Sequence, residues 1–476
     1  MTWEMVIGLE THVELSTKTK IFCSCTTEFG GEPNTHCCPV CTGMPGSLPV
    51  LNRAVTEYAA RAGLALGGAI QNRSIMSRKH YVYPDLPKAY QVSQYDLPLC
   101  VGGGITLSNG RRIDLTRIHI EEDAGKLVHV GREVLIDYNR GGVPLIEIVT
   151  EPDFRSADEV TEYMERLQTA LRAIGVSDCR MQEGSMRCDV NISLRQVGAE
   201  KYGIRAEVKN LNSFTSVAAA IAYEFERQAE ILEAGGTVVQ ETRSFDADTG
   251  ITAPLRDKEN ADDYRYFPEP DIVPVLLTDE LIDALRVALP EMPDAKLARY
   301  VAELGVAEAD AKLLTKYSAV SRYFEAASEG VSPRTVASFM VSTMFAQVTT
   351  EAEREKWNPS VTAAMLRELI ELIESGKVSR NVAKRVYSQM AEEGRAATAF
   401  LSAEDMEQFD DAKLTELCRA AVEGNPKSVA DYLKGKDKAL KAIVGAVMRE
   451  TKGRADALET ERIIKDIISE SSVESV

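Results

Sequence analysis

The chain has 476 residues, of which 73 are acidic and 55 basic, and a net charge of −18. Its length is too great for one hydrophobic core, so we expect two to four domains. The negative charge argues against a general nucleic-acid coat protein. The N-terminus has no basic-then-apolar leader, and no apolar run approaches the roughly 20 residues that span a bilayer, so we expect a cytoplasmic protein.

Residues 4 to 15 alternate with period two, which predicts a β-strand. Glu10, His12 and Glu14 lie on one face, and the apolar face carries Met5, Ile7, Leu9, Val13 and Leu15. The pattern returns at 186–195 and, more weakly, at 144–151 and 204–210. A solvated sheet face with cross-strand ion pairs is the ordinary interpretation. A histidine between two carboxylates favours a second interpretation, in which the charged faces of these strands build a common site.

Five of the nine cysteines lie within 19 positions. In a reducing compartment such cysteines are thiols or metal ligands. The Cys-x-Cys and Cys-Pro-Val-Cys pairs are similar to the paired knuckles of a structural zinc site, and the predicted ligands are Cys23, Cys25, Cys38 and Cys41. Cys37 is then the spare thiol and His36 an outside candidate. The alternative is a cluster of buried free thiols.

Residues 78–95 combine four tyrosines with Arg78, Lys79, His80 and Lys88, and two prolines exclude a helix. Such a loop can hold phosphate and stack a base or ribose, but a structural loop with packed tyrosines fits equally well. Further carboxylates follow at 119–126 and 137–147. Three carboxylates and one imidazole are a donor set for a hard cation such as Mg²⁺.

Several familiar motifs are missing from the sequence: a phosphate-binding P-loop, a dinucleotide fingerprint and a Gly-x-Ser-x-Gly elbow. Any use of ATP therefore requires an unusual scaffold. A capping-box pattern at 156–159 predicts a helix that ends at Gly175. Strand-like patterns stop near 262–271, where Arg265 is a candidate phosphate contact, and from about residue 279 the pattern is helical.

The last segment reverses the charge balance. Between Lys427 and Arg454 eight basic residues stand against three acidic ones, a local net charge of +5. This island predicts contacts with a nucleic-acid backbone, and the candidate residues are Lys436, Lys438, Lys441, Lys452 and Arg454. The solvated face of two helices is the alternative. The predicted domains are 1–292, 293–403 and 404–476.

Together these motifs resemble the B subunit of the tRNA-dependent amidotransferases. The resemblance rests on segments spread over nearly the whole chain: 7–15, 29–35, 81–91, 119–126, 144–153, 183–191, 207–214, 263–274 and 452–456. It implies an α+β fold, with a cradle domain built on antiparallel sheet, an all-α helical domain, and a small all-α tail domain that grips tRNA. It also implies ATP, Mg²⁺ and structural Zn²⁺.

The implied activity is phosphorylation of the side-chain carboxylate of Glu or Asp on misacylated tRNA(Gln) or tRNA(Asn), followed by amidation. Ammonia would come from an amidase A subunit, joined to this chain by a small C subunit in a heterotrimer. The implied catalytic and magnesium set is Glu10, His12, Glu122 and Glu147, and the implied ATP or substrate contacts are Lys79, Lys88, Arg187, Glu207, Lys209 and Arg265. The alternatives are a non-catalytic tRNA-binding scaffold and an ATP ligase for a free amino acid.

Overall fold

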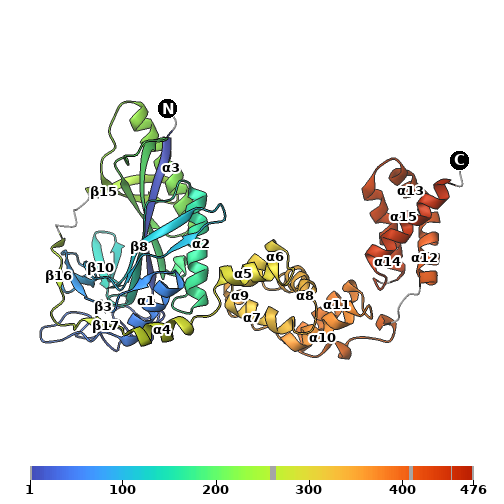
Figure 1. The fold of residues 1–476 in the computed structure, drawn as a ribbon, viewed down its shortest axis with the longest axis horizontal. Helices are drawn as coiled ribbons and strands as arrows, with labels where there is room; N and C mark the ends of the chain where they lie inside the picture. Colours follow the sequence, from blue (N-terminus) through green and yellow to red (C-terminus); the bar gives the residue numbers. More distant parts are fainter. Residues whose placement is uncertain (1–2, 258–263, 407–410, 452, 474–476) are drawn as a thin grey trace. The chain divides into compact units, whose positions relative to one another are not determined.

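The computed structural model describes residues 3–257, 264–406, 411–451 and 453–473 (Figure 1). The chain divides into two compact units, Met1–Pro293 and Asp294–Val476. The first unit combines a large sheet with helices, and the described part of the second is helical. Among the described residues, no helix combines the length and the apolar character needed to cross a lipid bilayer.

A ten-stranded sheet organises the first unit, in the order β15-β14-β13-β12-β1-β11-β8-β6-β2, with β7 attached to β8. Its strands are β1 (Trp3–Glu14), β2 (Ala69–Ile70), β6 (Cys100–Val101), β7 (Gly104–Thr106), β8 (Arg112–Glu122), β11 (Pro144–Thr150), β12 (Met186–Gln196), β13 (Ala206–Leu211), β14 (Glu241–Asp246) and β15 (Ile251–Asp257). All pairs are antiparallel except β13 and β14, which run parallel. The four strands predicted from period-two alternation are confirmed as strands of this sheet.

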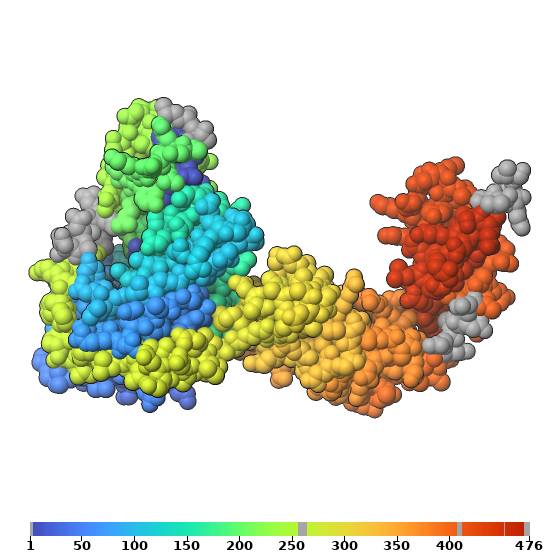
Figure 2. Space-filling view, viewed as in Figure 1, coloured from blue at the N-terminus to red at the C-terminus, as the bar shows by residue number. Residues whose placement is uncertain are grey.

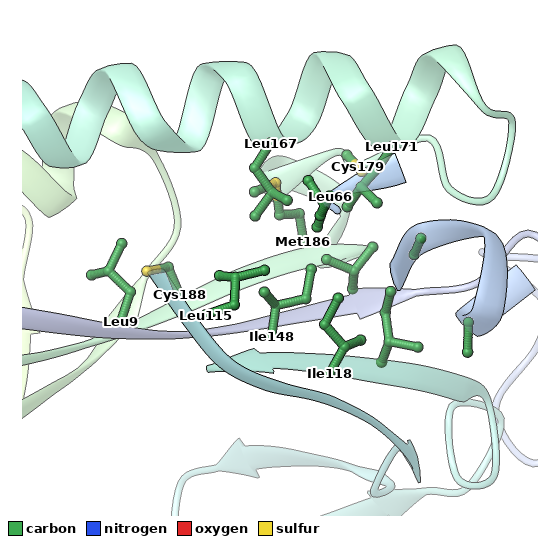
Figure 3. Packing of buried hydrophobic residues seen from close by; sticks show 14 of the residues in the cluster. Leu9, Leu66, Leu115, Ile118, Ile148, Leu167, Leu171, Cys179, Met186 and Cys188 are labelled. Carbon is green, nitrogen blue, oxygen red and sulfur yellow. The ribbon is translucent and has the colours of Figure 1, made fainter. Parts of the chain in front are cut away.

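Three helices cover the apolar side: α1 (Arg53–Ala65), α2 (Ala157–Ala173) and α3 (Phe214–Glu233). Figure 3 shows Leu167 and Leu171 of α2 directed toward the strands that carry Leu9 and Ile148, and all four residues belong to one buried cluster. A fourth helix, α4 (Asp279–Val287), packs beside α1, although the two are far apart in sequence (Figures 1 and 2).

The helix predicted from residue 156 begins with a variation on the expected capping box. The Ser156 side chain accepts a hydrogen bond from the Glu159 N–H at 3.2 Å, as predicted. The Glu159 carboxylate accepts instead from the Arg155 N–H, one residue before the cap. Both contacts satisfy donors at the helix start, so the N-terminus is still capped.

Three small sheets complete the first unit. The first pairs β9 (Lys126–Val130) with β10 (Glu133–Asp137). In the second, β4 (Ser77–His80) lies between β16 (Phe267–Pro268) and β5 (Tyr90–Ser93). The third pairs β17 (Val275–Leu276) with β3 (Arg73–Ser74). Strand pairing therefore continues to Leu276. The prediction that strands stop near 262–271 was wrong, because two-residue strands are too short to show alternation.

The second unit contains two separate hydrophobic clusters, one between Tyr300 and Ala397 and one between Leu414 and Ile468. The first is built by α5 (Pro293–Ala302), α6 (Glu308–Thr315), α7 (Ser318–Ala327), α8 (Pro333–Phe339), a π-helical turn (Met340–Met344), α9 (Glu351–Glu355), α10 (Ala363–Glu374) and α11 (Arg380–Glu393). The second is built by α12 (Asp411–Glu423), α13 (Pro426–Leu433), α14 (Leu440–Glu450) and α15 (Ala457–Val473).

Truncating Leu167 tests whether α2 holds the sheet. The side chain is completely buried, so Leu167→Ala should lower the free energy of unfolding of residues 1–293 by about 2–5 kcal/mol. Denaturant unfolding followed by near-UV circular dichroism measures the change. Val273→Ala, at a side chain 81% exposed, is the control and should change it by less than about 0.5 kcal/mol. Equal effects of the two variants would contradict the packing described.

Candidate functional site

Three neighbouring strands bring a histidine and two carboxylates together on the polar face of the large sheet. Nε2 of His12 lies 3.4 Å from Oε1 of Glu121 and 3.6 Å from Oε2 of Glu147. Nε2 of the buried His119 lies 3.2 Å from Oε2 of Glu147. We call His12, Glu121 and Glu147 the first metal group, because their ligand atoms lie within 4.8 Å of one another.

The strand register explains this convergence. His12 on β1 is paired with Glu147 on β11, and Glu147 is paired with His119 on β8. Directly opposed residues in a sheet share a face. Glu121 follows His119 by two positions and therefore points to the same side.

A second acidic group lies beside the first. Glu10, Asp189 and Glu207 come from β1, β12 and β13 and again place ligand atoms within 4.8 Å of one another. We call them the second metal group. Nζ of Lys209 lies 2.7 Å from Oδ2 of Asp189 and 3.4 Å from Oε1 of Glu207. Glu10 and His12 are alternate residues of β1, so the two groups are separated by about 7 Å along the strand.

Electrostatics in both groups favours a bound cation. Burial, and then the charge of Glu147, raises the pKa of Glu121 to about 7. Burial together with Glu147, Glu207 and Asp189 also raises the pKa of Glu10. Burial acts in the same direction on Glu147, but the neighbouring His119, His12 and Lys79 outweigh it and lower the pKa of that carboxyl. Crowded oxygen donors with raised pKa values are suited to a hard divalent ion.

Basic side chains border the two groups. Lys79 on β4 is half-buried near Glu121 and Glu147. Burial lowers its pKa, but Tyr266 and then these two carboxylates outweigh burial and raise it. Arg187 on β12 places Nη2 2.6 Å from Oδ2 of Asp123. A cavity of about 350 Å³ opens onto these residues and is lined by His12, Lys79, Glu121, Arg187, Asp189 and Lys209, among others.

A third charged group lies at the end of β1. Burial, and then the adjacent Asp123, raises the pKa of Glu14 to about 8. Asp123 has a lowered pKa, because Arg187 and Arg140 outweigh the effect of burial. Glu10, His12 and Glu14 alternate along the same face of β1, and each belongs to a different charged group.

The cysteine cluster lies apart from these residues. The sulfurs of Cys23, Cys25, Cys38 and Cys41 lie within 4.8 Å of one another, as the predicted zinc set requires. Cys37 is outside the set, with Sγ 3.9 Å from Oδ1 of Asn139, and His36 is not part of it either. A hydrogen bond from Cys23 is the main cause that lowers the pKa of Cys41 to about 4. Four converging thiols, one of which favours the thiolate, suit a closed tetrahedral zinc site.

Comparison with known proteins decides the family. The family model described as "GatB/GatE catalytic domain" matches residues 5–283, and the one described as "GatB domain" matches residues 322–468. The chain is 49% identical over 475 residues to the B subunit of the aspartyl/glutamyl-tRNA(Asn/Gln) amidotransferase from Thermoanaerobacter pseudethanolicus, covering 98% of this chain and all of the relative. The chain belongs to the GatB family. B subunits of the same name from Caldicellulosiruptor saccharolyticus and Geotalea daltonii are 50% and 47% identical, over 98% of this chain and 99% and 100% of theirs.

The structure separates one residue from the magnesium set predicted for this GatB chain. Glu122 is not among the residues of either metal group. Its side chain points to the opposite face of β8, where both carboxylate oxygens lie 2.6 Å from Nζ of Lys88 and one accepts a hydrogen bond from the Val92 N–H. The adjacent Glu121 shares a face with His119 and belongs to the first metal group. Glu10 is also in the second group, apart from His12 and Glu147.

The residues predicted to contact ATP or substrate also lie in more than one place in the structure. Lys79, Arg187, Glu207 and Lys209 lie around the two metal groups. Lys88 faces a different cavity, of about 140 Å³, together with Glu122. Arg265 is exposed with a left-handed backbone at φ 46°, and its carbonyl oxygen lies 3.2 Å from Nδ1 of His80.

Sequence reasoning assigned no role to several residues of the site, namely Glu121, His119, Asp189, Asp123 and Arg140. Alternation did place Glu14 on the same face as Glu10 and His12. Counting by two from His119 would have found Glu121. Alternation over 186–195 places Asp189 on the charged face of its strand, but its meeting with Glu10 and Glu207 depends on strand register. The position of Asp123 depends on loop geometry, for which the sequence carries no signal.

The basic residues predicted to contact RNA differ in their exposure and in their contacts. Lys438 and Lys441 are exposed, and Nζ of the exposed Lys436 lies 3.1 Å from Oδ1 of Asp431. Arg454 donates hydrogen bonds to the carbonyl oxygens of Thr451 and Glu404. Lys452 lies outside the described residues.

Adjacent glutamates offer a matched test of the metal geometry. Glu121→Gln should weaken Mn²⁺ binding, used as a probe for Mg²⁺, by at least about tenfold, because it removes a charged ligand. Glu122→Gln should leave the affinity within about twofold. Titration of free Mn²⁺ by electron paramagnetic resonance measures both. Loss of binding in Glu122→Gln alone would contradict the assignment.

A second matched pair tests the cysteine cluster. Cys38→Ser should reduce the zinc content from one atom per chain to a small fraction, because a closed site tolerates no missing thiolate. Cys37→Ser should keep the full content. Inductively coupled plasma mass spectrometry gives the stoichiometry. A wild-type chain purified with zinc present but holding none would favour the alternative of buried free thiols.

Proposed function

We propose that this chain activates the side-chain carboxylate of glutamate or aspartate on misacylated tRNA(Gln) or tRNA(Asn), using ATP, so that ammonia can convert it to the amide. One observation carries the proposal: two acidic groups lie next to each other along β1, and His12, Glu121 and Asp189 from these groups line one cavity. Lys79, Lys209 and Arg187 line the same cavity. Family membership and the name of the relatives support the same conclusion.

Activation is needed because a carboxylate is a poor electrophile. A side-chain oxygen attacks the γ-phosphorus of ATP, the bond to the β-phosphate oxygen breaks, and an acyl phosphate and ADP result. Ammonia then adds to the acyl carbon, phosphate leaves with the bonding electrons, and the proton lost from nitrogen ends on the departing phosphate as hydrogen phosphate. Catalysis of phosphoryl transfer consists mainly of positioning and charge stabilisation.

The residues of the cavity have separate tasks in this reaction. The oxygen and imidazole donors of the two metal groups would hold Mg²⁺, which when bound neutralises phosphate charge and orients the transferred group. Lys79 and Lys209 stand next to the first and second group, where each ammonium can pair with a phosphate oxygen. Arg187, held by Asp123, presents a buried Nε that has no hydrogen-bond partner in the described part of the chain.

His119 orients the first group. Its Nε2 lies 3.2 Å from Oε2 of Glu147, which fixes the position of that carboxylate oxygen. Hydrogen bonds of this kind keep ligand geometry in metal sites. The cysteine cluster would bind structural Zn²⁺, and it has no part in the reaction because four thiolates leave no open position.

The remaining parts of the proposal concern partners and organisation. The relatives are named as the B subunit of an amidotransferase, which supports an amidase A subunit as the ammonia source and a small C subunit in a heterotrimer. The separate clusters at 300–397 and 414–468 support a helical domain and a small tail domain after a cradle domain. Exposed Lys438 and Lys441 support tRNA binding by that tail. A cytoplasmic location follows from these substrates.

Release of ADP tests the proposed reaction. The chain, mixed with its amidase and C partners, is given glutamyl-tRNA(Gln), aspartyl-tRNA(Asn), uncharged tRNA or free glutamate. We expect ADP only with a misacylated tRNA, and a loss of at least about a hundredfold in Glu147→Gln, because the buried group then lacks a charge.

The exposed neighbour Glu151, which accepts a hydrogen bond from Thr116, supplies the control. Glu151→Gln should keep wild-type turnover. Full activity in Glu147→Gln would favour a non-catalytic scaffold, and ADP release with free glutamate would favour a ligase for a free amino acid. Binding of tRNA by Glu147→Gln, measured by filter binding, should stay unchanged.

A further inference from the structure

Four tyrosines form a continuous row beside the first metal group, and the proposed reaction does not use them. The rings of Tyr81 and Tyr264 meet edge to face at 5.9 Å, and those of Tyr264 and Tyr266 at 6.2 Å. Tyr266 and Tyr95 are stacked, with centroids 4.3 Å apart and planes only 11° apart. We call these four residues the tyrosine row.

One end of the row is anchored at the metal site. Nζ of Lys79 lies 4.7 Å from the ring centroid of Tyr264 and 5.8 Å from that of Tyr81. Lys79 also interacts with Glu121 and Glu147 of the first metal group. Tyr264 and Tyr81 line the same cavity as His12 and Glu121. The row therefore begins where the phosphates would bind.

The other end of the row is open. Tyr95 is 38% exposed, although one face of its ring is covered by Tyr266. Stacked aromatic rings usually complete a core, where both faces are covered. A flat ring that is stacked on one neighbour and is still more than a third exposed offers a surface on which a further planar group can stack.

A cation lies near Tyr266, the ring that covers one face of Tyr95. Arg117 is on β8, on the same face as His119 and Glu121, and its charge acts on the hydroxyl of Tyr266. Its Nε is buried and has no hydrogen-bond partner among the described residues. A buried donor without a partner costs stability unless a ligand supplies the acceptor. The flat aromatic surface of Tyr95 and the free donor of Arg117 together suit a nucleobase, which has a planar ring and acceptor atoms on its edge.

We propose that the tyrosine row is the binding platform for the purine ring of an adenosine, with Tyr95 as the outer stacking surface and Arg117 at the edge of the ring. The inference rests on the proposed function, which places two adenosines near this site: that of ATP and the one that ends every tRNA. Both share the chemistry that the platform recognises. Stacking of a base on an aromatic side chain contributes about tenfold or more to affinity.

Fluorescence distinguishes this role from ordinary packing. 2-Aminopurine loses fluorescence when it stacks on an aromatic ring, and packing among tyrosines alone would not affect it. Two probes are used with the full chain and its partner subunits: 2-aminopurine riboside triphosphate, and misacylated tRNA with 2-aminopurine at its 3′ end. Turnover of each probe shows that it is bound productively.

We expect quenching of one probe by the wild-type protein, and the quenched probe identifies the source of the adenosine. Tyr95→Leu should abolish the quenching and raise the KM of the same ligand about tenfold with little change in kcat. Tyr95→Phe keeps the ring and should retain both. Tyr202→Leu, at a tyrosine 58% exposed next to Arg195, is the matched control and should behave as wild type.

The proposed platform is contradicted if the wild-type protein turns over both probes without quenching the fluorescence of either. It is also contradicted if Tyr95→Leu still quenches the probe that the wild-type protein quenches. The first measurement needs no variant, so it decides the question even if Tyr95→Leu does not fold. Failure of the proposed function is a separate result, since ADP would then be released with neither misacylated tRNA.

Discussion

Alternation along β1 is the constraint on which the rest of the first unit depends. Ile7, Leu9 and Val13 are buried on one side of this strand, and Glu10 and His12 belong to the metal groups on the other. A shift of pairing by one residue would move every apolar side chain to the polar face and bury the charges. Burying an unpaired charge is far costlier than losing an apolar contact. The hydrophobic core therefore fixes the register, and the register in turn fixes which carboxylates meet.

The same constraint explains how so much negative charge is tolerated. Each acidic group has a cation beside it, Lys79 at the first metal group, Lys209 at the second, and Arg187 at Asp123. The pKa values of Glu10 and Glu121 remain raised beside these cations, first because the carboxylates are buried and second because other carboxylates are close. A ligand that brings further positive charge would reduce the repulsion between neighbouring carboxylates. Binding of such a ligand would therefore stabilise the site.

Much of the fold could be read from the sequence, because it rests on periods that a single strand or helix displays. Period two revealed β1, β11, β12 and β13, and helical spacing revealed α2. What failed were features that depend on pairing between distant segments. The family resemblance implies Glu122 as a magnesium ligand, whereas the pairing of β8 with β11 places the adjacent Glu121 on the same face as His12. Two-residue strands such as β16 and β17 carry no period at all.

A single strand can serve two cavities, and β8 does so through consecutive residues. Glu121 faces the metal groups, and Glu122 faces the cavity that Lys88 and Cys41 also line. Buried Lys20, whose Nζ donates to the carbonyl oxygen of Gly141 at 2.7 Å, ties the cysteine segment to the loop that leads into β11. Because Glu147 follows on that strand, a closed metal site at the cysteines would stabilise the position of a ligand it does not touch. A structural ion and a reactive site can thus share one sheet while their chemistry stays on opposite faces.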